Sequence, residues 1–322
     1  MQGFYRSIIH KAIEITLRYK YLWFFGIFAS FTANGEEYDI LARNLNTVGD
    51  MQKNLERLSG FKENGTLATG WENISSYISE NLFTAFLLAL AILAVLLLII
   101  WIVTVSQAAI ISAAARHEKK KSVNFLDLFW NGHHYFWRIF IVNVYAKIIL
   151  WGIILIPGIP LAILFLNTNS LSYAVTLSLI AFIMLVPVSI IFSFITKFAA
   201  SFIVIQDMKA REAFIAAWKL FFKNWLVSLE MALLLFLINF VLSFLVIVIL
   251  SFLGLPFTFT GTLILTYIVV FIGALLATFQ FSSWTLLFLR LIEGKSFSKL
   301  TRFMAERGWV PSKEAASRNT KL

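Results

Sequence analysis

The chain contains no cysteine among its 322 residues, and charged residues make up only 14% of it. The lack of cysteine excludes disulfide bonds, thiolate nucleophiles and cysteine-bound metal or iron–sulfur sites. The scarcity of charge excludes an ordinary soluble domain, in which about 25% of residues are charged. Hydrophobic residues account for 60% of the chain and gather in long runs, so the sequence predicts an integral membrane protein.

Catalytic motifs are also lacking. The sequence contains no phosphate-binding loop, no dinucleotide-binding glycine pattern, no nucleophile elbow and no zinc-protease helix motif. Two of the histidines, His133 and His134, are adjacent, so on a helix their side chains diverge by about 100° and form a poor metal pair. We therefore expect no enzyme activity, no catalytic residues, no metal and no cofactor.

Apolar runs suited to crossing a hydrocarbon core, which takes about 20 helical residues, divide the chain. They cover residues 17–33, 82–115, 138–166, 171–205, 225–253 and 262–291. The first run is the weakest, because its apolar part is short and follows a basic segment, as in a cleaved signal peptide. The bulky Phe31 argues against cleavage after Ala33. The sequence thus predicts an all-α polytopic membrane bundle of six transmembrane helices.

The distribution of basic residues assigns each charged segment between these runs to one side of the membrane. Segments 1–20, 116–147, 197–230 and 290–322 together hold 23 basic and 9 acidic residues, whereas segment 34–80 holds 4 basic and 8 acidic residues. Lysine and arginine collect on the cytoplasmic side of a membrane. We therefore predict a multi-pass cell-membrane protein with cytoplasmic N- and C-termini and an external segment 34–80.

The predicted domain organisation has two parts. Residues 1–295 form a six-span membrane domain, and residues 296–322 form a basic cytoplasmic tail with an interfacial helix. Within the first part, apolar residues recur at helical spacing between Leu41 and Leu58, which predicts that segment 34–80 forms an external helical cap. A surface for docking a protein partner is an alternative reading of the same segment.

Each of the four basic segments contains a short amphipathic, aromatic stretch that ends in tryptophan. We interpret them as parts of about three helix-hairpin repeats with cytoplasmic interfacial helices. Indole rings favour the headgroup level, and lysine and arginine reach lipid phosphates, so we expect anionic membrane lipids as partners and no nucleic acid. The predicted membrane-interface anchors are Trp23, Trp130, Trp137, Trp218, Trp225 and Trp309.

Ionisable residues within the apolar runs are few. Lys147 is the deepest, and we predict that it forms an intramembrane polar pair with Glu230. Lys197 lies near the end of its run, where we expect its ammonium group to snorkel to the interface. Structural pairing or snorkelling is the simpler interpretation of all three residues.

Prolines interrupt two of the predicted spans. Because a proline removes a backbone donor and crowds the preceding turn, we expect Pro157 and Pro160 to break the third run and Pro187 to kink the fourth. A broken helix at membrane depth can build a substrate site, so a small-molecule or lipid permease is an alternative function. Small residues across Ser106–Ala115 instead predict close helix packing.

Two stretches, RYKYLWFFGIFASF at Arg18–Phe31 and KLFFKNWLVSLEMALLLFLINF at Lys219–Phe240, carry a family resemblance. They resemble the non-catalytic membrane domain of bacterial glycerophosphoryl diester phosphodiesterases and related uncharacterised multi-pass membrane proteins. The likeness covers roughly residues 1–295. It implies a lipid-facing helical module, and the 31 residues after Leu291 leave no length for a hydrolase domain. The leading hypothesis is therefore a non-enzymatic, lipid-contacting scaffold or partner-binding module.

Overall fold

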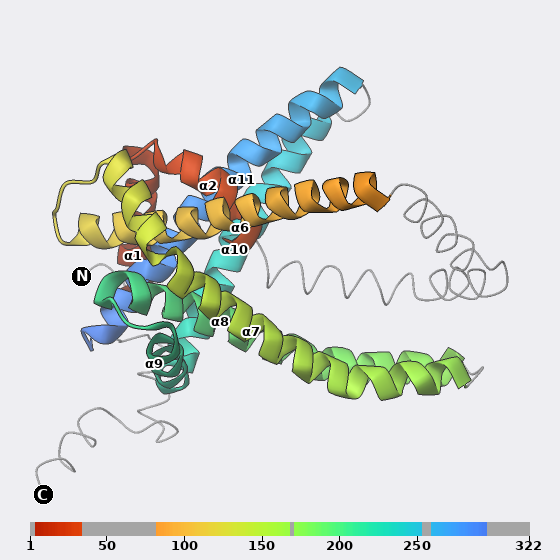
Figure 1. Ribbon diagram of the computed structural model, residues 1–322. Helices are drawn as coiled ribbons and strands as arrows, with labels where there is room; N and C mark the ends of the chain where they lie inside the picture. Colours follow the sequence, from red (N-terminus) through yellow and green to blue (C-terminus); the bar gives the residue numbers. More distant parts are fainter. Residues whose placement is uncertain (1–3, 34–81, 168–170, 253–258, 295–322) are drawn as a thin grey trace, which may run out of the picture. The chain divides into compact units, whose positions relative to one another are not determined.

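A computed structural model describes residues 4–33, 82–167, 171–252 and 259–294 of the chain (Figure 1). The described residues form eight α-helices and no strand, so the predicted all-α class is confirmed. The predicted cap at 34–80, the tail at 296–322 and Trp309 lie outside the described residues. The helices are α1 (Phe4–Arg18), α2 (Leu22–Ala33), α6 (Leu82–Glu118), α7 (Phe125–Asn167), α8 (Leu171–Gln206), α9 (Ala210–Lys223), α10 (Trp225–Phe252) and α11 (Phe259–Ile292).

Five of the described helices, α6, α7, α8, α10 and α11, are long and apolar enough to cross a membrane. They correspond to five of the six predicted spans and support the prediction of a multi-pass membrane protein. The run at 17–33 does not form a single helix, because a turn at 19–21 separates α1 from α2. The 12 described residues of α2 rise only about 18 Å, less than a hydrocarbon core of about 30 Å.

The turn before α2 falls where the sequence pattern changes. In α1, Ile8, Ala12 and Ile15 are buried on one face while Ile13 and Leu17 are exposed, as in an amphipathic helix. The sequence of α2, LWFFGIFASFTA, is apolar all round. Because the two patterns require different surroundings, one straight helix cannot satisfy both.

Contacts divide the chain into two compact units. The first unit comprises Met1–Asn34, Val103–Val144 and Ser193–Leu322, and the second comprises Gly35–Ile102 and Tyr145–Phe192. In the second unit, the large apolar side chains of α6 from Leu82 to Ile100 are exposed, as expected of a surface that faces lipid. The first unit contains the packed core and the polar groups described below.

The C-terminal parts of α6, α8 and α11 provide most of the core of the first unit. Every residue of α6 from Val103 to Ala115 is buried, so the predicted packing role of this small-residue stretch is confirmed. Aromatic rings join α8 to α11, with 5.1 Å between the ring centroids of Phe194 and Trp284 and 4.7 Å between those of Phe202 and Phe288. Interdigitated rings of this kind leave a filled interior.

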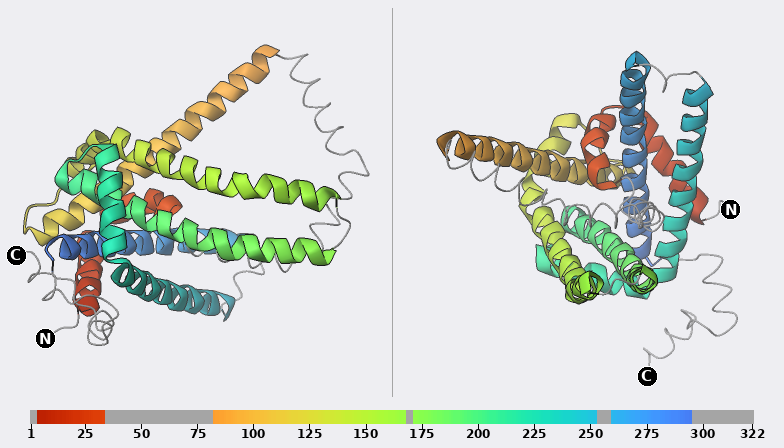
Figure 2. Two further views of the ribbon diagram at one scale, coloured as in Figure 1. Left: turned by 90° about the horizontal axis from the view of Figure 1, so that it is seen from below. Right: turned by 90° about the vertical axis from the view of Figure 1, so that its right-hand side faces the viewer.

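Helices α1 and α2 both pack against α11 within the first unit (Figure 2). A Cβ atom added to Gly26 of α2 would lie 2.2 Å from the carbonyl oxygen of Ala274. The Thr278 hydroxyl donates a hydrogen bond to the carbonyl oxygen of Leu22 at 3.2 Å. Gly132 of α7 approaches Val105 of α6 in the same way, with 2.5 Å between the added Cβ and the carbonyl oxygen. Glycine therefore permits both helix crossings.

The prediction that Pro157 and Pro160 break the third run is wrong, because α7 continues as a helix through both positions. A proline removes one backbone donor, but in membrane helices local adjustments satisfy the freed groups, since an unpaired backbone group in lipid costs several kcal/mol. Pro187 also lies inside a helix, α8. Its predicted kink stays a prediction.

The basic segments that contain Trp137 and Trp225 differ in the way their helices continue into the apolar span. Asn224 ends α9 as a C-cap, where its side-chain amide and its backbone N–H both donate to the carbonyl oxygen of Leu220 at 3.1 Å. When Trp137 is superposed on Trp225, the position of Asn224 is occupied by Phe136. Phenylalanine has no amide to cap a helix, so α7 passes directly from the basic aromatic stretch into the span.

Candidate functional site: a polar cleft between α1 and α6

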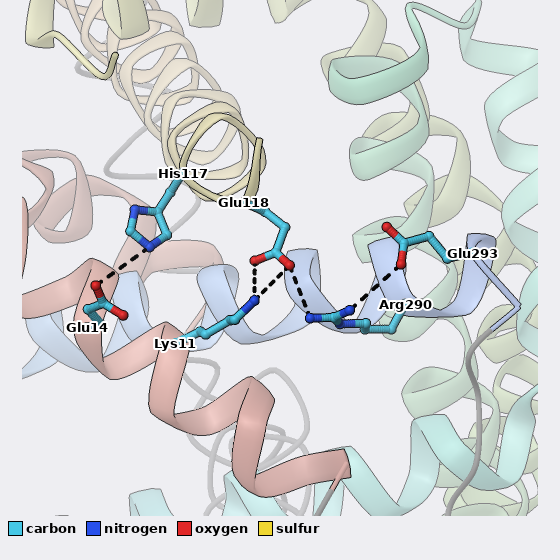
Figure 3. Close-up of polar contacts among 6 residues, drawn as sticks. All are labelled: Lys11, Glu14, His117, Glu118, Arg290 and Glu293. Carbon is cyan, nitrogen blue, oxygen red and sulfur yellow. Dashed lines mark hydrogen bonds and ion pairs between the residues drawn. The ribbon is translucent and has the colours of Figure 1, made fainter. Parts of the chain in front are cut away.

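Three helices of the first unit meet at Glu118, the last residue of α6. The ammonium group of Lys11 on α1 donates to both carboxylate oxygens of Glu118 at 2.8 Å (Figure 3). The guanidinium of Arg290 on α11 donates to Glu118 at 3.1 Å and lies 3.7 Å from Glu293. Lys11, Glu118 and Arg290 form what we name the Glu118 cluster. Because all three side chains are partly shielded from solvent, this cluster ties the helix ends together more firmly than an exposed ion pair.

A second polar group lies on the neighbouring turn of the same two helices. The Glu14 carboxylate lies 4.0 Å from Nε2 of His117 and 3.4 Å from the Arg18 guanidinium. The Tyr19 hydroxyl lies 3.2 Å from the other ring nitrogen of His117, Nδ1. The imidazole is therefore held between a phenol and a carboxylate, and Glu14 has two cationic or potentially cationic neighbours.

These two groups border a cleft of about 600 Å³. Its wall contains four basic side chains and two carboxylates, so its formal charge is +2 with His117 neutral. A second hollow of about 450 Å³ shares Glu14 and Arg18 with the cleft and is also lined by Ile13 and Leu17. In addition to the six residues named above on α1, α6 and the turn before α2, the cleft is lined by Lys120, Lys121 and Ser122.

The end of α6 brings Lys120 and Lys121 to the cleft. Lys120 has φ 54°, in the left-handed region, where glycine is usual. Its N–H donates to the carbonyl of His117 at 3.0 Å, and the N–H of Lys121 donates to that of Arg116 at 2.9 Å. This pair of bonds is a Schellman motif, with lysine where the motif favours glycine. Neither lysine forms an ion pair within the part of the chain that the structure describes.

A row of aromatic rings leads from the cleft toward the apolar helix α2. Successive ring centroids are separated by 5.9 Å, 6.3 Å, 5.8 Å and 5.3 Å. The row, which we name the aromatic ladder, consists of Tyr19, Tyr21, Phe125, Phe24 and Phe28. It begins at a hydroxyl beside His117 and ends among hydrocarbon groups, so it is polar at one end and apolar at the other.

Tyr21 anchors the turn between α1 and α2. Its hydroxyl donates a hydrogen bond to the carbonyl oxygen of Val123 at 2.7 Å, which ties this turn to the connection between α6 and α7. Burial raises the pKa of the Tyr21 hydroxyl above its ordinary value, and the neighbouring Tyr19 raises it further. The Tyr21 hydroxyl therefore keeps the proton that it donates to a higher pH than a free tyrosine would.

The predicted tryptophan anchors have different surroundings in the structure. Trp23 is partly buried, and its indole N–H donates to the carbonyl oxygen of Thr16 at 2.7 Å, so it holds α2 against α1. Four other anchors on α7, α9 and α10 are exposed. They are Trp130, Trp137, Trp218 and Trp225. Their role at the membrane interface stays a prediction.

The predicted intramembrane charges are not gathered at the cleft. Lys147 is exposed in the second unit, whereas Glu230 in the first unit accepts a hydrogen bond from the Tyr5 hydroxyl. Their pairing stays a prediction. Lys197 differs from expectation: its residue is only 7% exposed, and its ammonium group lies 5.2 Å from the ring centroid of Trp284. A cation–π contact in the core replaces the expected snorkelling.

No local sequence pattern predicts the Glu118 cluster. Lys11 and Glu118 are 107 positions apart, and Glu118 and Arg290 are 172 apart, so no local pattern joins them. One signal was available: Glu118 is one of only two carboxylates in the strongly basic segment 116–147. An acidic residue among mostly basic neighbours is a candidate for a structural ion pair.

The cleft wall combines four basic side chains and two carboxylates with two hydroxyl groups. No group of three or more metal-ligating side chains that could hold a metal ion occurs in residues 4–33, 82–167, 171–252 and 259–294. Comparisons with protein-family models, curated proteins and solved structures find no match to this chain. The cleft offers ammonium, guanidinium and hydroxyl donors, a set suited to a ligand with anionic oxygens.

Proposed function

We propose that this chain is a non-enzymatic, multi-pass cell-membrane protein that contacts anionic lipid through short helices on its cytoplasmic side and acts as a scaffold. The observation that carries the proposal is the amphipathic character of α1 and α9. In α1, the apolar Ile13 and Leu17 are exposed beside Arg18. In α9, one apolar face is buried and consists of Ala213, Phe214, Ala217 and Phe221. Trp218 and Lys219 of the same helix are exposed.

Exposed apolar and basic side chains on one short helix suit a membrane surface. The apolar groups enter the acyl boundary, while lysine and arginine reach lipid phosphates. In a bilayer whose cytoplasmic leaflet carries anionic lipid, each basic residue near the surface adds about 1 kcal/mol to the attraction. The resemblance that the sequence predicts, to a non-catalytic, lipid-facing membrane domain, would imply the same role.

The proposed topology has six crossings, with α2 beginning the first and the five longer apolar helices as the others. The charge distribution supports it, since basic residues dominate all four segments assigned to the cytoplasm and acidic residues dominate segment 34–80. With six crossings both termini are cytoplasmic. In the same topology the three helix-hairpin repeats each begin with a basic interfacial stretch.

A permease is the second candidate, and one observation favours it. Gln107 Oε1 and the hydroxyl oxygens of Ser282 and Ser283 are buried in the first unit with no hydrogen-bond partner among the described residues. Buried polar atoms of this kind suit a hydrated path. The aromatic filling between α8 and α11 favours the scaffold, because it occupies the space that a solute would need.

Lipid analysis of the purified protein tests the proposal. The full chain is extracted with its surrounding membrane in polymer nanodiscs, and the phospholipids are quantified by mass spectrometry. We expect anionic phospholipids to be enriched about twofold or more over the bulk membrane, because several basic residues each contribute at the surface. Equal composition in the nanodiscs and the bulk membrane would contradict lipid selection and therefore the proposed function.

A further inference from the structure

The charges of the cleft leave two cations in excess at its rim. Glu118 is balanced by Lys11 at 2.8 Å and by Arg290 at 3.1 Å. Glu14 is balanced by Arg18 at 3.4 Å. Lys120 and Lys121 then remain, both exposed and both in the cleft wall. Two adjacent ammonium groups that face the same cleft attract a singly or doubly negative group.

The donors at this rim match phosphate oxygens. Each lysine supplies three N–H donors, and the hydroxyl of Ser122 lies in the same wall. A carboxylate presents two acceptor oxygens, whereas a phosphodiester presents two charged oxygens and two ester oxygens that lead onward to other groups. The cleft volume of about 600 Å³ accommodates a headgroup of that size.

The surroundings of the cleft suit an amphiphile rather than a free ion. The aromatic ladder runs from Tyr19, in the cleft wall, to the exposed Phe24 of the apolar helix α2. The second hollow, which shares Glu14 and Arg18 with the cleft, is lined by the exposed Ile13 and Leu17. A ligand with a charged head and hydrocarbon chains has apolar surface to contact beside the charged groups, and inorganic phosphate does not use that surface.

Resting on the proposed function, we infer that the cleft between α1 and α6 is a binding site for the phosphate of one anionic phospholipid headgroup, held by Lys120 and Lys121. The acyl chains extend along the aromatic ladder and the apolar side of α1. The left-handed conformation of Lys120 agrees with this role. A glycine there would relieve backbone strain but would supply no ammonium group.

The test measures lipid binding to the full-length protein in detergent by native mass spectrometry. The probe is a short-chain phosphatidylglycerol, and phosphatidylcholine with the same acyl chains is the zwitterionic comparison. We expect one phosphatidylglycerol per chain to be retained preferentially. Replacing Lys120 and Lys121 by glutamine should weaken its apparent affinity by roughly 25-fold, because each lysine contributes about fivefold.

A matched control removes the same charge elsewhere. Lys209 and Lys223, at the two ends of α9, are also exposed and two in number, and neither lines the cleft. The double variant K209Q/K223Q should retain the single bound lipid with less than a threefold change in affinity. Equal losses in the two double variants would show a general charge effect and would overturn the assignment to the cleft.

A glycine variant and a competition experiment with soluble phosphates test the interpretation further. Lys120→Gly should lose about fivefold in affinity without losing thermal stability, which separates binding from folding. Inorganic phosphate or glycerol phosphate at the concentration of the lipid should leave the bound lipid in place. Displacement by either would identify a soluble phosphate as the occupant and overturn the lipid assignment. If nanodiscs show anionic enrichment but K120Q/K121Q binds like the wild type, the cleft assignment fails while the proposed function stands.

Discussion

At the scale of single residues, Lys120 combines a backbone cost with a chemical gain. Its φ of 54° places a β-carbon in the region that glycine occupies most readily, at the point where a Schellman motif ends α6. A residue that carries such strain persists when the surrounding structure fixes it or when its side chain has a task. In the proposed lipid site, that task is the binding of the lipid phosphate by the exposed ammonium group of Lys120.

We predict that Lys120→Gly stabilises the protein by about 1 kcal/mol, because it removes the left-handed strain of a residue with a side chain. The measurement is the midpoint of thermal unfolding in detergent, followed by size-exclusion chromatography of heated samples. Lys121→Gly is the control. Lys121 is not in the left-handed region, so this glycine should lower the midpoint or leave it unchanged. Equal stabilisation by both variants would contradict the explanation.

The identity of single residues also determines which intramembrane charges the sequence can identify. The scarcity of ionisable residues in the apolar runs singled out Lys147, Lys197 and Glu230 from the sequence. Their surroundings could not be predicted in the same way, because the Trp284 ring beside Lys197 lies on a separate helix, α11, and the Tyr5 partner of Glu230 lies on α1. Composition indicates that a charge is costly, whereas tertiary packing determines how that cost is met.

At the scale of helices, hydropathy predicts well which residues form each apolar span. It predicts poorly whether a basic stretch before a span forms a separate helix. The expected runs at 82–115, 171–205 and 225–253 agree closely with α6, α8 and α10, since about 20 apolar residues define a span. The junctions depend on single residues. Asn224 caps α9, but no residue ends the helix at the matching position of α7, so one basic stretch is a separate helix and the other is continuous with its span.

Helix crossings provide a prediction at this scale. Gly26→Ala should destabilise the protein by about 1–3 kcal/mol, because the new Cβ would lie 2.2 Å from the backbone oxygen of Ala274 and would push α2 away from α11. Gly152→Ala in α7 is the matched control, since no atom lies within 4 Å of its added Cβ.

In the control, alanine should raise the unfolding midpoint slightly, because its helix propensity exceeds that of glycine by about 1 kcal/mol. Both variants are measured by thermal unfolding in the same detergent. A Gly26→Ala protein as stable as Gly152→Ala would show that α2 and α11 do not approach as closely as the structure indicates.

At the scale of the whole molecule, the separation of charge leads to a topological prediction. The chain has no cysteine, so single cysteines report location without background labelling. We expect a membrane-impermeant maleimide added to intact spheroplasts to label Ser59→Cys but neither Gln2→Cys nor Ser312→Cys. Lysed membranes should give labelling at all three positions.

This pattern tests the crossing by α2 directly. If α2 does not cross the membrane, Gln2 and Ser59 lie on the same side and should be labelled alike. The wild-type protein serves as the unlabelled reference, and a lysed sample of each variant shows that its cysteine is reactive. Labelling of Gln2→Cys and Ser59→Cys together in intact spheroplasts would support five crossings over six.

The packing of α2 on α11 also has a consequence for biogenesis. Thr278 and Leu22 are joined by a hydrogen bond although they are 256 positions apart in the chain. At about 5–20 residues per second, the ribosome needs roughly 10–50 s to synthesise the partner that α2 requires. During that interval the nascent N-terminal helices lack their native neighbour and depend on the insertion machinery or a chaperone. A protein truncated before α11 would leave that surface uncovered and become a substrate for membrane quality control.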